Sequence, residues 1–148
     1  MRDGTDGTLA RLERSLRRRK RPLLYLMGAF YVVAGVMHFV VPQVYAQVVP
    51  PAFPRPLALV YLSGAAEVLL GVGVLIPRTR RLAAWGLILL LLAVFPANVY
   101  MATHDVVLEG VPAWASTPSD AATWARLPLQ LVFVGWAWWY TRPNPDAD

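Results

Sequence analysis

The hydrophobic pattern along the chain consists of four apolar segments separated by short polar or proline-rich stretches. These segments cover residues 23–41, 57–76, 82–102 and about 122–141. An apolar helix needs about 20 residues to cross a hydrocarbon core of roughly 30 Å, and the first three segments reach that length. The fourth reaches it only when the turns that follow a helix-start signal at Ser119 are included. The pattern predicts an all-α integral membrane protein, folded as a four-helix bundle.

Basic residues indicate how this bundle is oriented. They crowd residues 1–22 and recur in the turn at residues 77–81, whereas the other two connections hold only Arg55 and Arg126. The positive-inside rule places the tail and the turn in the cytoplasm, together with both chain termini. We therefore expect a multi-pass protein of the cell membrane, with a membrane domain at residues 23–142 and a short cytoplasmic tail at residues 143–148.

The basic N-terminal tail allows two interpretations. Leu9, Leu12 and Leu16 recur at helical spacing between arginines, a pattern typical of an amphipathic helix lying on anionic headgroups. Alternatively, the tail is disordered and serves only to set the topology. In both cases the net charge of +5 belongs to residues that flank apolar spans, so the expected partner is anionic lipid and not nucleic acid.

Composition limits the chemistry that the chain can carry out alone. With 57% hydrophobic and 16% charged residues it is too apolar for a soluble globule of 148 residues. Cysteine is absent, which excludes disulfides, thiolate metal sites and a thiol relay within this chain. The two histidines lack the spacing of helical metal or haem sites. We expect no metal, no haem and no covalently bound cofactor.

Polar side chains inside the apolar segments are the candidate functional residues, because each costs free energy in lipid and must face the bundle interior or water. Counted along the helices, they fall in the outer half of the bundle, which predicts one shared polar pocket. Three further residues are predicted to support the pocket. Tyr31 shares a helix face with His38, and Ser63 shares one with Glu67. Tyr100 lies two residues after Asn98. The five candidates are His38, Glu67, Asn98, Arg126 and Gln130.

Each candidate also has a structural interpretation. Glu67 can form a buried ion pair with Arg126, or be protonated and hydrogen-bonded across helices, and neither arrangement need be functional. His38 can be a hydrogen-bonded histidine near the membrane interface. Asn98 follows Pro96, whose ring leaves a helix carbonyl unpaired, so Asn98 can serve to repair a kinked helix.

Six short motifs, distributed in order over all four segments, are similar to those of the DoxX family of small bacterial and archaeal membrane proteins. The similarity covers nearly the whole chain from Leu23 to Arg142. It implies a four-helix bundle and, for some members, a part in thiosulfate oxidation with electron transfer to quinone, or in a membrane-associated oxidoreductase complex. Relatives in the wider superfamily are chaperone-like. The motifs are Ala34-Gly35-Val36-Met37-His38-Phe39, Val49-Pro50-Pro51, Ser63-Gly64-Ala65-Ala66-Glu67, Ala84-Trp85-Gly86, Phe95-Pro96-Ala97-Asn98-Val99-Tyr100-Met101 and Arg126-Leu127-Pro128-Leu129-Gln130.

Two functions remain open. In the first, the protein is the membrane subunit of a quinone-linked oxidoreductase: Arg126, Gln130 and Asn98 hold the quinone oxygens, Glu67 and His38 exchange protons, and a soluble or membrane redox partner delivers the electrons. In the second, the polar residues only stabilise the bundle, and the protein is a non-enzymatic anchor or assembly factor. A pathway for protons or small molecules is a weaker third option. No self-contained catalytic machinery is visible, so the chain is at most one subunit of an enzyme.

Overall fold

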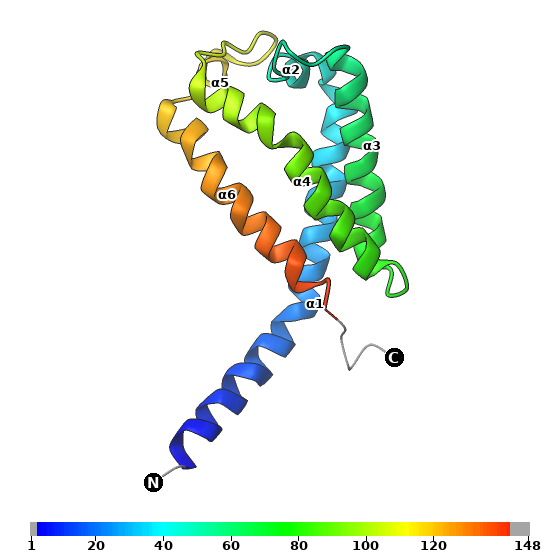
Figure 1. Ribbon diagram of the computed structural model, residues 1–148, viewed down its shortest axis with the longest axis vertical. Helices are drawn as coiled ribbons and strands as arrows, with labels where there is room; N and C mark the ends of the chain where they lie inside the picture. Colours follow the sequence, from blue (N-terminus) through cyan, green and yellow to red (C-terminus); the bar gives the residue numbers. More distant parts are fainter. Residues whose placement is uncertain (1–2, 143–148) are drawn as a thin grey trace.

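The computed structural model describes the backbone of residues 3–142 and the side chains of residues 21–142. In this part of the chain every regular element is a helix, which confirms the all-α prediction (Figure 1). The tail at residues 143–148 and the leucines of the N-terminal tail fall outside the described backbone and side chains. The elements are α1 (Asp3–Val40), α2 (Pro42–Ala46), α3 (Pro56–Leu75), α4 (Arg80–Thr103), α5 (Ala113–Ser116) and α6 (Asp120–Trp139).

Three helices are long and apolar enough to cross a membrane: Arg21–Val40 within α1, then α3 and α4. They coincide with the first three apolar segments of the sequence. Many of their large apolar side chains are exposed, among them Leu62, Leu69 and Leu89, as expected for surfaces that face lipid and not water. The fourth segment forms the helix α6, and its crossing of the membrane stays a prediction.

The first helix is longer than its apolar segment, because it begins at Asp3 and includes Pro22. The backbone of the basic tail is therefore helical and continuous with the first span. Figure 1 shows this part of α1 projecting beyond the other helices. Proline lacks the N–H that would continue the helix ladder, which marks Pro22 as the natural bending point between the tail and the span.

Each long helix packs against the next one in the chain: α1 against α3, α3 against α4, and α4 against α6. Glycines bring α1 and α3 into backbone contact. A Cβ atom built on Gly35 would lie 2.6 Å from the carbonyl oxygen of Gly64, and one built on Gly64 would lie 2.5 Å from the Cβ of His38. These distances are too short for any side chain, so the close approach of the two helices depends on glycine at both positions.

The helices converge at the end of the molecule that holds the α3–α4 connection, called here the turn end. Met27, Val74 and Leu87, from α1, α3 and α4, are fully buried in a cluster that also contains Ala137 of α6. The helices α1 and α6 meet through the stacked rings of Phe30 and Phe133, whose centroids are 5.1 Å apart.

The opposite end, called here the loop end, holds α2, α5 and the two longer connections (Figure 1). One side chain ties these connections together. The backbone N–H of Glu109 donates to Oε1 of Gln47 at 2.7 Å, and Nε2 of Gln47 donates to the carbonyl of Glu109 at 3.2 Å. Gln47 thus imitates the pairing of a β-ladder and joins the first connection to the last one across the loop end.

Candidate functional site

Two of the five predicted site residues meet where α1 and α3 are closest. Nδ1 of His38 lies 3.5 Å from Oε2 of Glu67, and both side chains are mostly buried. Nδ1 also donates to the backbone carbonyl of Ala34 at 2.9 Å, a bond that requires the proton to be on this nitrogen. Nε2 is therefore the nitrogen that can take up or release a proton. The Gly35–Gly64 contact makes this pairing possible, because it brings the two backbones together beside both residues.

Two buried polar atoms of this site have no hydrogen-bond partner among the described residues: Oε2 of Glu67 and the hydroxyl of Tyr31. Tyr31 is only 3% exposed, and it lies on α1 seven residues before His38. The Glu67 carboxylate is within electrostatic range of the Tyr31 hydroxyl. Tyr31 therefore offers a donor that no described group uses, and its supporting role stays a prediction.

Tyr45 covers this site from the loop end, although it was not among the predicted site residues. Its ring stacks on that of His38 with centroids 3.9 Å apart and an interplanar angle of 22°. Burial, and after it the Glu67 carboxylate, raise the pKa of the Tyr45 phenol, whereas the Arg126 guanidinium acts in the opposite direction. Pro42 at the start of α2 is the sequence signal for this arrangement, because proline favours the first turn of a helix.

A second pair joins α4 and α6. Nδ2 of Asn98 donates to Oε1 of Gln130 at 2.6 Å, and Nε2 of Gln130 donates to the backbone carbonyl of Leu91. A carbonyl only accepts, so the bond to Leu91 determines which end of the Gln130 amide faces Asn98. The accepting carbonyl lies one residue before the one that Pro96 leaves unpaired. Gln130 thus adds a bond near Pro96 from across the helix interface, whereas the Asn98 amide bonds Gln130 and not its own helix.

Arg126 is exposed near the start of α6, and its Nη1 lies 3.5 Å from Sδ of Met101. Within residues 21–142 it forms no ion pair with Glu67, so that interpretation is wrong; the carboxylate faces His38 instead. The physical reason is the order of packing. The helix that carries Glu67 packs against α1 and α4, whereas the helix that carries Arg126 packs against α4.

The other two supporting residues do not extend either pair. The hydroxyl of Ser63 donates to the carbonyl of Val60 in its own helix at 3.0 Å. The ring of Tyr100 packs against that of His104, with centroids 4.3 Å apart, at the exposed end of α4. The predicted polar layer is thus two separate pairs, an acid–base pair on α1 and α3 and an amide pair on α4 and α6.

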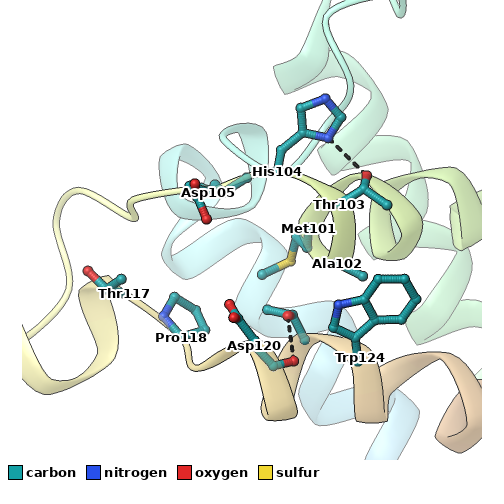
Figure 2. Close-up of a pocket in the computed structure, with 11 residues that line it drawn as sticks. Met101, Ala102, Thr103, His104, Asp105, Thr117, Pro118, Asp120 and Trp124 are labelled. Carbon is teal, nitrogen blue, oxygen red and sulfur yellow. Dashed lines mark hydrogen bonds between the residues drawn. The ribbon is translucent and has the colours of Figure 1, made fainter.

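A cavity of about 220 Å³ opens at the loop end, between the last turn of α4 and the start of α6 (Figure 2). Figure 2 shows Asp120 and Trp124 of α6 near Met101 and Ala102 of α4, with His104 hydrogen-bonded to Thr103 and pointing away. The cavity does not include the His38–Glu67 pair. Among the described residues, no group of three or more side chains could hold a metal ion.

Comparison with known proteins gives one family. The family model described as "Domain of unknown function (DUF8561)" matches residues 27–141, from the middle of α1 to the residues just after α6. No curated protein and no solved structure matches the chain. The description of the family includes no activity, so the resemblance to DoxX proteins stays a prediction.

Proposed function

We propose that this chain, which belongs to the DUF8561 family, is the membrane subunit of a quinone-linked oxidoreductase system in the cell membrane. In this proposal α6 is the fourth crossing of a four-helix bundle. The turn end and both termini are cytoplasmic, and the ligand site lies in the outer half. The three apolar helices, the 20-residue length of α6 and the arginines of the turn end support this arrangement.

One observation carries the ligand part of the proposal: the unpartnered Tyr31 hydroxyl and Glu67 carboxylate beside His38. Leaving a buried polar atom without a partner costs about 1–3 kcal/mol, so the site gains stability when a ligand supplies the missing groups. A quinone matches the pair in chemistry. Its carbonyl oxygen accepts from a tyrosine hydroxyl, and the hydroxyl of the reduced form donates to a carboxylate.

The roles of the protein side chains follow from their positions. A bound quinone would supply two-electron, two-proton redox chemistry, with the electrons delivered by a partner protein. Tyr31 orients the ligand, Glu67 holds a proton next to it, and His38 passes protons through Nε2 toward the loop end below Tyr45. Asn98 and Gln130, which the sequence analysis assigned to the ligand, hold α4 to α6 instead.

Binding of a short-tailed quinone, such as decylubiquinone, to the purified protein in nanodiscs tests the proposal. We expect saturable binding by isothermal titration. Tyr31→Phe should bind the oxidised quinone about tenfold more weakly, because it removes the donor to the quinone carbonyl. Glu67→Gln should bind the reduced form, decylubiquinol, about tenfold more weakly, because it removes the carboxylate acceptor. Ser63→Ala is the matched control, since its hydroxyl bonds only within its own helix, and it should bind as the unmodified protein does. Absence of saturable binding, or unchanged binding by both site variants, contradicts the proposal.

The alternative is a non-enzymatic anchor or assembly factor, and a specific observation favours it as well. Asn98, Gln130 and Arg126 all find partners inside the protein and need no ligand. In that case the buried pairs determine only how the helices pack. Extraction of lipids from the purified protein distinguishes the two functions, because only the first predicts that a quinone is retained in stoichiometric amount.

The proposed topology has its own test, which is simplified by the absence of cysteine. Single cysteines at Thr5, Phe53, Thr79, Ser116 and Asn144 sample every connection and both tails. We expect an impermeant maleimide to label only Phe53→Cys and Ser116→Cys in intact cells, and all five variants after lysis. Labelling of Thr79→Cys in intact cells contradicts the orientation. Labelling of Asn144→Cys there shows that α6 does not cross.

A further inference from the structure

Arginines from three segments gather at the turn end, and neither proposed function uses them. The set, called here the arginine patch, consists of Arg21, Arg78, Arg80, Arg81 and Arg142. They lie at the start of the first span, in the α3–α4 turn and first turn of α4, and just after α6. Figure 1 shows that these three places lie at the same end of the molecule.

Acidic side chains are missing from this end in the described part of the chain. Within residues 21–142, Glu67 lies in the middle of α3, and the three other acidic residues, Asp105, Glu109 and Asp120, lie at the loop end. The arginine patch therefore keeps its positive charge, and a ligand of opposite charge has no described carboxylate to displace.

Two of the arginines are held in place by the protein itself. Nε of Arg80 donates to the carbonyl of Val74 at 3.0 Å, near the end of α3. The guanidinium of Arg142 lies over the ring of Trp138, 4.3 Å from its centroid. Arg80 is within electrostatic range of Tyr140, so the α3–α4 turn lies beside the end of α6. Cations positioned in this way lose little conformational freedom when they bind an anion.

The surface next to the arginine patch is apolar. Leu82 is 77% exposed, and Trp85 and Trp138 are about half exposed, on the parts of α4 and α6 nearest the patch. Exposed leucine beside exposed tryptophan and arginine is the pattern of a membrane interface, where acyl chains contact the apolar side chains and the headgroup contacts the cations.

We infer that the arginine patch binds the headgroup of an anionic phospholipid, with Arg80 and Arg142 as its main phosphate ligands and the acyl chains along the exposed apolar faces of α4 and α6. Guanidinium groups are well suited to this role because they bind phosphate oxygens through two parallel hydrogen bonds. The inference is independent of the quinone site, which lies around the middle of α3 and near the loop end of α1.

The test is a lipid titration of the full-length protein. Delipidated protein in detergent is titrated with phosphatidylglycerol or with phosphatidylcholine, and retained lipid is counted by native mass spectrometry. We expect phosphatidylglycerol to bind at least about tenfold more tightly than phosphatidylcholine. Each arginine near an anionic surface contributes a factor of about five, so R142Q should weaken phosphatidylglycerol binding about fivefold and R80Q/R142Q about 25-fold.

Matched variants separate this site from a general effect of charge. R55Q removes one exposed arginine at the loop end and should leave lipid binding unchanged. Arg142 is exposed beyond the end of α6, so R142Q alone keeps the test valid if the double variant does not fold. The inference is overturned if both lipids bind equally or if R142Q binds phosphatidylglycerol as the wild type does. It is also overturned if glycerol phosphate competes fully at the same concentrations as the lipid, because that result indicates a site for free phosphate.

Discussion

Replacing Gly64 with alanine is expected to destabilise the protein by about 2 kcal/mol, although alanine favours helix more than glycine does. The new Cβ would lie 2.5 Å from the Cβ of His38 and 2.9 Å from the carbonyl oxygen of Gly35. Both atoms belong to the backbone of α1 or are held directly by it, so no rotamer change can relieve the clash and the helices must separate. Overpacking of this kind costs about 3 kcal/mol, of which better helix propensity offsets about 1.

Gly135→Ala is the matched control for this substitution. Gly135 is also a helical glycine, but a Cβ built on it meets nothing within 4 Å. We expect this variant to be neutral or more stable by up to about 1 kcal/mol. Unfolding by denaturant in detergent, followed by circular dichroism, measures both variants. If Gly64→Ala is as stable as Gly135→Ala, then α1 and α3 do not pack backbone to backbone.

The outcome at Gly64 also bears on the proposed site. His38 and Glu67 lie on the two helices that this contact brings together, and the Ala34 carbonyl and the Tyr45 ring hold only the His38 side of the pair. A separation of the helices should therefore weaken quinone binding in Gly64→Ala but not in Gly135→Ala. The glycines thus connect the packing of the bundle to its proposed chemistry.

Helices were the most predictable part of this structure. A run of about 20 apolar residues has few alternatives to a helix in lipid, because every backbone group must be paired within the segment. Three predicted segments accordingly match helices to within a few residues. The length of α1 was harder to predict, since the leucine spacing allowed a helix in the basic tail but gave no signal that it continues through Pro22 into the first span.

Pairing of the polar residues was less predictable than their positions. The cost of polar side chains in lipid singled out five residues, which the structure places as the pair His38–Glu67, the pair Asn98–Gln130 and a separate Arg126. Sequence spacing gives the face of each helix but not which helix that face meets. That choice depends on the close glycine contacts of α1 with α3, and it places Glu67 beside His38 and not beside Arg126, which was one of the alternatives.

Replacing Gln130 with leucine is expected to cost about 2–3 kcal/mol, although leucine is more apolar and of similar size. Gln130 is only 4% exposed and bonds both Asn98 and the carbonyl of Leu91. Its removal leaves the half-buried Asn98 amide without its partner, at a cost of about 1–3 kcal/mol, less where lipid-exposed states find new partners. It also deletes the second bond to the Leu91 carbonyl, which keeps the bond from its own helix, at a cost of about 0.5–1.5 kcal/mol. Denaturant unfolding measures the loss, which should be larger than that of Ser63→Ala.

A double-mutant cycle tests whether Asn98 and Gln130 act on each other. Asn98→Leu alone leaves Oε1 of Gln130 unpaired, but with Gln130→Leu already present it leaves no unpaired side-chain amide. We therefore expect the double variant to be about 1 kcal/mol more stable than the sum of the single effects predicts. Gln130→Leu combined with Ser63→Ala should be additive within about 0.5 kcal/mol, since these residues share no partner. Additivity in the Asn98–Gln130 cycle means that the two amides are not bonded. In that case α6 is held to α4 by apolar contact alone, and Gln130 becomes available again as a ligand for the quinone.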